Sequence, residues 1–291
     1  MNEGLASKKF ANQVMSGLFI AGAVGAAILL FAFIGFVVGQ GLSGVSIDIL
    51  VGLKDVFFNT IYLVVLALIF SAIWGIPAGI FLAEYAKDSK LTGWVRMAVE
   101  TLSSLPSIVV GLFGYLVFIV MTGSQWNLFA GAIAVSMLTL PLLTSVTENA
   151  LRDLPKEYTL GSLGLGASKW QTIWHVLLPA CLPRLMTGLI LAAGRGFGEA
   201  AALMFTSGMS TDIDWDNWDI SDVTCPLNPF RPGETLALHV WVMRTEALDP
   251  NAAKIAGVTS AILMTVVVLF NVLARYISWR LEKKMEGASD E

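Results

Sequence analysis

The feature that most constrains this chain is the way its apolar residues are grouped. Long apolar blocks alternate with short polar segments along 291 residues, of which 56% are hydrophobic and only 14% charged. A soluble domain of this size carries charge on nearer a quarter of its residues. A helix needs roughly 20 mainly apolar residues to cross the hydrocarbon core of a bilayer. The pattern therefore predicts an all-α integral membrane protein with six transmembrane helices. The six blocks cover residues 16–39, 57–83, 105–121, 128–147, 185–205 and 255–274.

The blocks also predict how the chain is divided. The first block follows Lys8 and Lys9, but its apolar run is too long for a signal peptide and no clear cleavage site follows it, so we expect an uncleaved anchor. No linker or repeat divides the remainder. We predict an N-terminal segment over 1–56, with the anchor helix and an outer loop, and a core of five helices over 57–291.

Lysine and arginine in the connecting segments predict the orientation, because cytoplasmic segments are enriched in both. Two sets of segments alternate along the chain, and one set is clearly more basic. We therefore place the basic set in the cytoplasm, with both termini, and the chain in the inner or plasma membrane of a bacterium or archaeon. The basic set holds Lys8, Lys9, Lys87, Lys90, Arg96, Arg152, Lys156, Lys169, Arg184, Arg275, Arg280, Lys283 and Lys284, and the opposite set Lys54, Arg231, Arg244 and Lys254.

The largest outer segment covers about 207–254 and is strongly acidic, with Trp215 and Trp218 among its carboxylates. One interpretation is a solvated loop whose tryptophans rest at the membrane interface, and the other is a docking surface for an external protein. The aspartates at 212, 214 and 216 resemble the start of a calcium loop. The loop's glycine and its closing glutamate are absent, so we predict no metal site.

Residues that often carry chemistry are few and scattered. Cys181 and Cys225 fall on opposite sides of the predicted membrane, and His175 and His239 are isolated. We therefore predict no disulfide, no cofactor and no catalytic residue. No basic patch suggests a nucleic-acid partner.

The cytoplasmic segment at about 148–179 is longer than a simple turn and becomes helical in character after Pro155. It suits either a protein-docking element or an amphipathic helix on the lipid surface. Two glycines have the spacing of a phosphate-binding loop, but Ala167 follows where the lysine belongs, so this chain does not hydrolyse ATP. The notable residues are Gly161, Gly164 and Gly166, then Trp170, Ile173 and Trp174 on one apolar face.

The fifth block contains an arginine and a glutamate, which are costly inside a membrane. Arg195 and Glu199 are four residues apart, a spacing that puts them on one helix face. Gly194 and Gly198 form a small-xxx-small pattern that allows close helix packing. One interpretation is a structural ion pair that holds the bundle together. The other is an anion pathway in which Arg195 meets an oxyanion and Glu199 tempers its charge.

The cytoplasmic segment resembles a known signature. Gly166 followed by Val176-Leu177-Leu178-Pro179 is similar to half of the EAA loop of permeases in binding-protein-dependent ABC importers, although Leu160-Gly161-Ser162 stands where that family has Glu-Ala-Ala. The resemblance implies a coupling helix that inserts into a groove of a cytoplasmic ATPase. The implied coupling residues are Gly161, Gly164, Gly166, Ala167, Trp170 and Ile173.

Two further runs resemble phosphate ABC permeases, and the PstA type more than the PstC type. Residues 194–206 are similar to the family's G-R-x-x-G-E-T-A-P-L-L-F-T, with Ala200 and Ala202 in place of Thr and Pro, and residues 105–113 read LPSIVVGLF where the family has I-P-S-I-V-x-G-L-F. Residues 234–237 and 271–275 match later segments in order, so the resemblance runs from about residue 57 to the last helix.

This resemblance implies a type I ABC importer transmembrane domain of the MetI-like kind, which is not itself an enzyme. It implies that Arg195 and Glu199 line a phosphate path shared with a PstC-like sister permease. An ATPase dimer and an external phosphate-binding protein are the other implied partners. A permease for phosphonate or sulfate is an alternative. A stand-alone secondary transporter is another, against which stand the EAA-type loop and the absence of a detectable inverted repeat.

Overall fold

The computed structural model describes residues 2–87 and 89–287, and every regular element in this part of the chain is helical. Five helices there are long and apolar enough to cross a membrane, and a sixth crossing exists if one bent helix pair counts as a span. The all-α membrane prediction is confirmed, and six spans are reached only with the bent pair.

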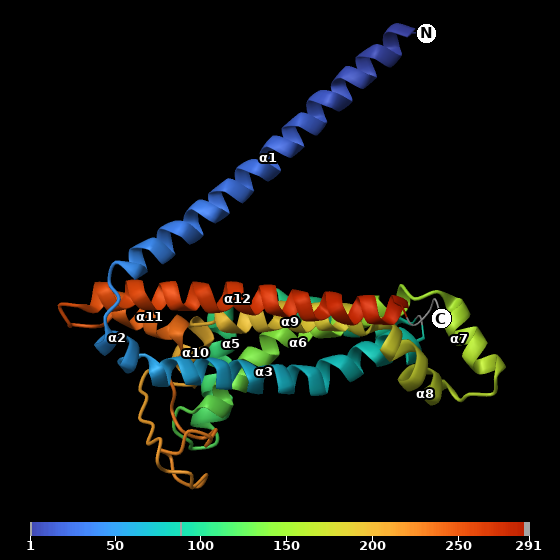
Figure 1. Ribbon diagram of the computed structural model, residues 1–291. Coiled ribbons are helices and arrows are strands. Elements are labelled where there is room, and N and C mark those ends of the chain that lie inside the picture. The colour runs from blue at the N-terminus through green and yellow to red at the C-terminus, as the bar shows by residue number, and fades with distance from the viewer. Residues whose placement is uncertain (1, 88, 288–291) are drawn as a thin grey trace.

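The long core helices lie side by side along a common axis in Figure 1. They are α3 (Lys54–Ile80), which continues as the π-helix η1 (Phe81–Tyr85), α6 (Leu128–Arg152), α9 (Leu178–Phe197) and α12 (Ala252–Gly287). The shorter α7 (Lys156–Gly164) lies at one end of this bundle and α11 (Leu236–Thr245) at the other. These ends are called the α7 end and the α11 end below.

Helix α6 is the centre of the core, with 61% of its most apolar window buried. It packs closely on α3, because a Cβ on Gly79 would come within 2.5 Å of Thr147 Cβ. The Ser71 hydroxyl meets the Thr139 hydroxyl at 2.6 Å across the same interface. Small residues thus let the two backbones approach, and the buried hydroxyls satisfy each other.

The predicted third span, 105–121, is the outer arm of a bent pair. Helix α4 (Lys90–Ser103) meets α5 (Ser107–Gly114) and the π-helix η2 (Tyr115–Val120) at 98°. The bend lies at Pro106, the residue that precedes α5, whose backbone is extended (ψ 136°). A proline ring also disfavours helical backbone in the residue before it. Residues 107–120 rise only ~21 Å at 1.5 Å per residue, less than the ~30 Å hydrocarbon core. This arm alone is therefore short for a crossing.

The N-terminal helix α1 (Asn2–Leu42) diverges from the bundle, as Figure 1 shows. None of its most apolar window is buried within the chain. It joins the core near its end, where a Cβ on Gly41 would collide with Ala261 of α12. The short helix α2 (Ile47–Gly52) then leads into α3. The division at residues 56 and 57 stays a prediction.

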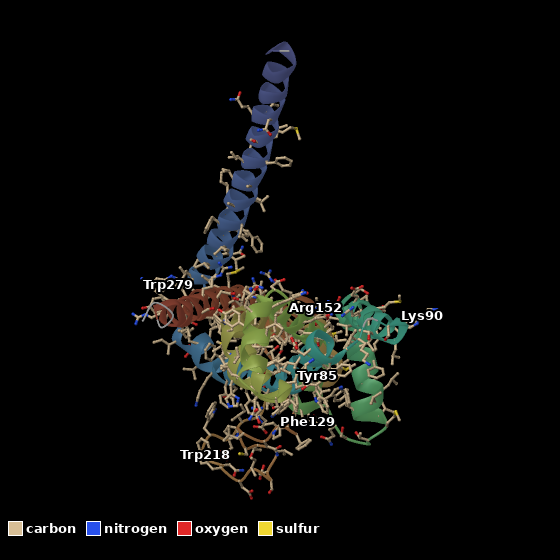
Figure 2. The ribbon with its side chains drawn as sticks, turned by 90° about the vertical axis from the view of Figure 1, so that its right-hand side faces the viewer. Tyr85, Lys90, Phe129, Arg152, Trp218 and Trp279 are labelled. Carbon is tan, nitrogen blue, oxygen red and sulfur yellow. The ribbon has the colours of Figure 1, made fainter. Side chains whose placement is uncertain are left out.

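The acidic outer segment is only partly the solvated loop that its composition suggests. Trp218 is exposed and lies far out on the loop in Figure 2. Trp215, by contrast, donates a hydrogen bond to Asp55 at 2.7 Å and lies under Lys54, so it packs on the start of α3. Arg231 is fully buried.

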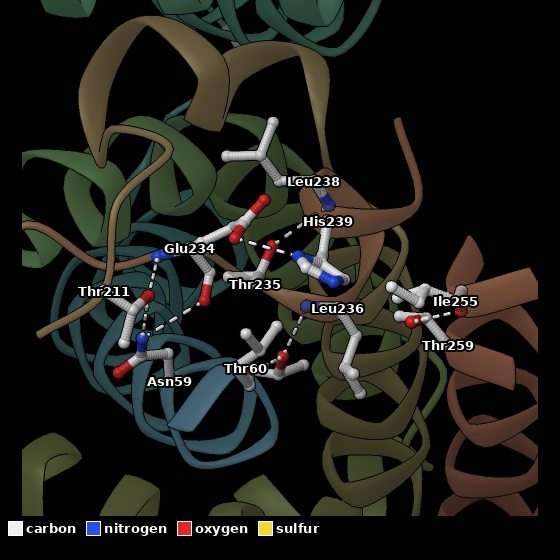
Figure 3. Close-up of polar contacts among 11 residues, drawn as sticks. Asn59, Thr60, Thr211, Glu234, Thr235, Leu236, Leu238, His239, Ile255 and Thr259 are labelled. Carbon is white, nitrogen blue, oxygen red and sulfur yellow. Dashed lines mark hydrogen bonds and ion pairs between the residues drawn. The ribbon is translucent and has the colours of Figure 1, made fainter. Parts of the chain in front are cut away.

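A buried polar cluster ties this segment to α3 (Figure 3). Asn59 accepts a hydrogen bond from Arg231 at 2.5 Å and donates to the Glu234 carbonyl at 3.2 Å. The Glu234 carboxylate lies 2.9 Å from the ring of His239. The prediction of an isolated His239 was therefore wrong, because the first turn of α11 brings its ring to the carboxylate of Glu234, five residues earlier, just before the helix.

Candidate functional site

The predicted fifth span is broken at its charged run. Helix α9 ends at Phe197, and the separate helix α10 (Ala201–Thr206) begins after Glu199 and Ala200. Ala200 leaves helical geometry at φ −124° and ψ −42°. A carboxylate oxygen of Glu199 accepts a hydrogen bond from the Ala202 N–H at 3.0 Å. The glutamate therefore satisfies a free donor at the start of α10 and stabilises the break.

The break separates two charges that a continuous helix would place on one face. Glu199 is buried, whereas Arg195 is exposed on α9. No ion pair or hydrogen bond of the described side chains involves the Arg195 guanidinium. The mutual neutralisation inferred from a continuous helix is thus wrong for this chain. A guanidinium at this depth costs about 2.5–3.5 kcal/mol on insertion scales, so the face that carries Arg195 is not suited to lipid.

The two motif runs meet in space, which their separation of some ninety residues could not reveal. A Cβ on Gly111 of α5 would lie 2.7 Å from the Ala202 Cα of α10. A Cβ on Gly114 would lie 2.9 Å from the Thr206 side chain. Because both contacts leave no room for a side chain, α5 fixes the position of α10 and hence of the break beside Arg195.

The small-xxx-small pattern at Gly194 and Gly198 does not mediate close packing within the chain. The nearest atom that a Gly194 Cβ would meet is the Asn271 amide nitrogen of α12, at 4.0 Å. Close packing occurs instead at Gly188, where a Cβ would come within 2.8 Å of Val146 on α6. Within the chain, the glycine of α9 that packs closely on a neighbour is therefore Gly188, on the helix face turned toward α6.

The segment between α6 and α9 forms α7, a tight turn and α8 (Lys169–Thr172), as the helical character after Pro155 predicts. Gly166 adopts φ +88°, a conformation that favours glycine. Ala167 follows it, and Ser168 begins α8 with a capping box to Gln171. Apart from the helix's own backbone, no atom of the described residues lies within 4 Å of a Cβ built on Gly161 or on Gly164. These two glycines therefore face open space.

The predicted apolar face after this turn points in two directions. Trp170 is 60% exposed and Trp174 49% exposed, and their rings meet edge to face at 5.4 Å. Ile173 is fully buried with Leu151 and Leu177. Ile173 therefore packs inside this chain, and only the tryptophans of that face are available to a partner. The π-helical turn η3 (Ile173–Leu177), which joins α8 to α9, rotates the side chains away from simple α spacing.

Two features near the α7 end were not recognised in the sequence. Three leucines of the α7 region, Leu160, Leu163 and Leu165, are exposed by 67%, 42% and 92%. A single carboxylate oxygen of Glu148 binds Arg96 of α4 at 2.9 Å and Arg152 of α6 at 3.1 Å. Arg152 follows Glu148 by four residues, so this ion pair could be predicted from the sequence. The pair with Arg96 could not, because only the bend at Pro106 brings α4 beside α6.

Comparison with known proteins now places the chain in a family. Residues 75–286 match the family described as "Binding-protein-dependent transport system inner membrane component". The probable ABC transporter permease protein YqgI of Bacillus subtilis is 39% identical over 291 residues, which cover 96% of this chain and 99% of that protein. The phosphate transport system permease protein PstA of Yersinia pestis is 34% identical over 233 residues, which cover 78% of this chain and 72% of that protein.

The fold is also that of solved ABC transporter chains. A chain of the MetNI methionine ABC transporter, in an inward facing conformation, superimposes with a TM-score of 0.62 at 17% identity, covering 81% of this chain and 99% of that one. This likeness concerns the fold alone. With the family match and the relatives, it confirms the resemblance to ABC permeases and the MetI-like fold. The chain therefore belongs to the family of binding-protein-dependent transport system inner membrane components, the multi-pass membrane permeases of ABC transporters.

Proposed function

We propose that this chain is one of two permease subunits of an importer that moves inorganic phosphate across the membrane with energy from ATP. The observation that carries the proposal is Arg195, an unpaired guanidinium on the exposed face of α9, beside a helix break. A planar guanidinium matches a tetrahedral oxyanion through paired hydrogen bonds. Since lipid is an unfavourable neighbour for it, Arg195 faces a water-filled path shared with a sister permease.

The relatives support phosphate as the substrate. The Yersinia pestis protein, 34% identical, is named a phosphate transport system permease. The two runs that resemble phosphate permeases are the same two that meet at Gly111 and Ala202. Another oxyanion, such as sulfate or phosphonate, remains the alternative substrate, and competition in an uptake assay separates them.

The α7 segment supports a partnership with a cytoplasmic ATPase. Its exposed leucines and the glycines at 161 and 164 present an apolar surface with room for close approach. We place the α7 end in the cytoplasm, with both termini, and the α11 end outside. There the exposed acidic loop with Trp218 meets an external phosphate-binding protein.

The test is phosphate uptake in vesicles that contain the reconstituted complex. We expect Arg195→Gln to abolish uptake while the complex still assembles, and Arg195→Lys to retain little activity because lysine lacks the planar fork. Glu199→Gln keeps an oxygen that accepts the Ala202 N–H but removes the charge, so its loss of activity reports the charge alone. Arg184→Gln, which affects an exposed pair with Asp153 at the α7 end, is the matched control and should transport normally.

The double variant Arg195→Gln/Glu199→Gln decides between a path and a structural pair. A path predicts that it assembles but remains inactive. A structural pair predicts that each single change lowers complex yield, since it leaves one charge unpaired, and that the double change restores both yield and uptake. Restored uptake would contradict the role of Arg195 in the path.

A further inference from the structure

A cavity with a mixed polar and apolar lining lies in the groove between α9 and α12, on the α7 side of Arg195. Its apolar walls are Ile190, Leu191 and Trp279. Its volume is about 390 Å³, far more than the ~10–15 Å³ that one water needs. The polar residues that line it are Thr187 of α9 and Asn271, Arg275 and Ser278 of α12. No carboxylate is among its lining residues. The cavity therefore offers hydrogen-bond donors and one positive charge without a built-in counterion.

Arg275 is the uncommitted donor in this cavity. It is exposed, and no hydrogen bond or ion pair of the described side chains involves its guanidinium. The other polar groups are partly occupied, since Thr187 donates to the Pro183 carbonyl at 3.1 Å and Asn271 to the Val267 carbonyl at 2.8 Å. The arginines of the cavity between α4 and α6 differ, because Glu148 binds both of them.

The cavity lies beside the turn of α9 that precedes Arg195, although Arg195 itself does not line it. The Asn271 amide nitrogen is 4.0 Å from where a Cβ on Gly194 would be, so Asn271 lies at the depth of the residue before Arg195. Arg275 follows Asn271 by four residues on α12, which places it ~6 Å nearer the α7 end at 1.5 Å per residue. Among the described side chains, the guanidinium groups of Arg195 and Arg275 thus have no ion-pair partner and lie at successive depths on the two neighbouring helices.

We propose that Arg275, with Asn271, forms a second oxyanion-binding site in the groove between α9 and α12. Its ligand is a tetrahedral phosphate oxyanion, bound by the guanidinium fork and by the free amide N–H of Asn271. That phosphate moves from Arg195 toward this second site, and so toward the α7 end, rests on the proposed function. A free phosphate ion and a phospholipid headgroup share this chemistry, and the experiment below separates them.

The test reads the cavity directly by thiol labelling. The complex, purified through a tag on this chain in a maltoside detergent without phospholipid, carries Ser278→Cys in a Cys181→Ala/Cys225→Ala background. The alkylation rate of the new thiol is measured alone, with inorganic phosphate, with sulfate, and with phosphatidylglycerol. It is then measured again with Arg275→Gln. Arg280→Gln is the matched control, because Arg280 lies on the same helix but bonds to Tyr276 and does not line the cavity.

We expect inorganic phosphate to slow alkylation in the parent and in the Arg280→Gln control. Losing a charged hydrogen-bond donor should weaken phosphate binding roughly tenfold or more, so protection should disappear with Arg275→Gln. Protection by phosphatidylglycerol alone, with the same dependence on Arg275, assigns the site to lipid headgroups. Equal rates in every condition, or protection that persists with Arg275→Gln, overturn the proposal.

Uptake by the same complexes distinguishes this failure from that of the proposed function. Phosphate uptake that is normal in the parent and equally normal with Arg275→Gln, together with unprotected labelling, overturns the second site alone. A parent complex that takes up no phosphate overturns the proposed function instead.

Discussion

At the scale of single residues, the turn before α8 requires left-handed backbone at Gly166. Its φ of +88° lies where side-chain-bearing residues are strained, yet within the part of the chain that the structure describes nothing beyond its two neighbours lies within 4 Å of a Cβ built there. A substitution at Gly166 therefore changes backbone energy without causing a collision in the isolated subunit. Gly161 and Gly164 have the same open space but ordinary helical backbone, so they allow the two effects to be separated.

Gly166→Ala should destabilise the turn by about 1–2 kcal/mol, because left-handed backbone is unfavourable for a residue with a Cβ. We expect the subunit to insert normally but to retain less ATPase during copurification. Gly166→Asn should be milder, since asparagine tolerates this conformation. Gly164→Ala is the control for added bulk. If Gly166→Ala retains the ATPase as well as Gly164→Ala does, the turn is not what positions α7 for its partner.

At the scale of helices, the position of the break beside Arg195 depends on the contact between α5 and α10. The contact has no room for a side chain, because a Cβ built on Gly111 would lie 2.7 Å from the Ala202 Cα. Backbone cannot move aside as a flexible side chain can. The same bend at Pro106 that turns α5 into the bundle lays α4 across the α7 end, where Arg96 reaches Glu148. The bend at Pro106 thus positions both α4, beside Glu148, and α5, beside α10.

Gly111→Val should force α10 away from α5 and disturb the groove that carries Arg195. Overpacking of this kind costs about 1–3 kcal/mol, so we expect a lower melting temperature of the purified complex and a loss of uptake. Gly93→Val in α4 is the matched control, because nothing lies within 4 Å of a Cβ at Gly93. Unchanged stability and uptake with Gly111→Val would show that the α5–α10 contact is not essential.

At the scale of the whole molecule, the orientation in the membrane assigns each docking surface to a compartment. The exposed leucines lie in the α7 region, and the acidic loop extends from the part of the bundle near α2 and α10, away from α7 (Figure 1). The beginning of α1 and the end of α12 point toward the α7 end in Figure 1. In the orientation that we propose, the ATPase and the external binding protein therefore approach opposite ends of one bundle.

Cysteines at two exposed positions test this orientation. In a Cys181→Ala/Cys225→Ala background, Asp216→Cys should react with an impermeant thiol reagent added to intact cells. Lys156→Cys should react only after the membrane is permeabilised. Both native residues are exposed, so differences in labelling report the side of the membrane and not burial. The reverse pattern would exchange the two docking surfaces.

The sequence by itself determined the class of protein and most of its helices. Because a bilayer offers the backbone no hydrogen-bond partners, long apolar blocks can cross it only as helices or closed barrels, and blocks of roughly 20 residues favour helices. The turn at Gly166 was also readable, since local backbone geometry demands a glycine there. The resemblance of short runs identified the permease family without knowledge of any contact.

Only the tertiary structure decided how the functional residues are arranged. It separated Arg195 from Glu199, turned Ile173 inward, brought Arg96 to Glu148 and placed Arg275 in the groove between α9 and α12. The reason is that residues facing lipid and residues facing protein are both apolar in a membrane helix, so periodicity does not identify the packed face. A helix break or bend also depends on which distant backbone packs against it.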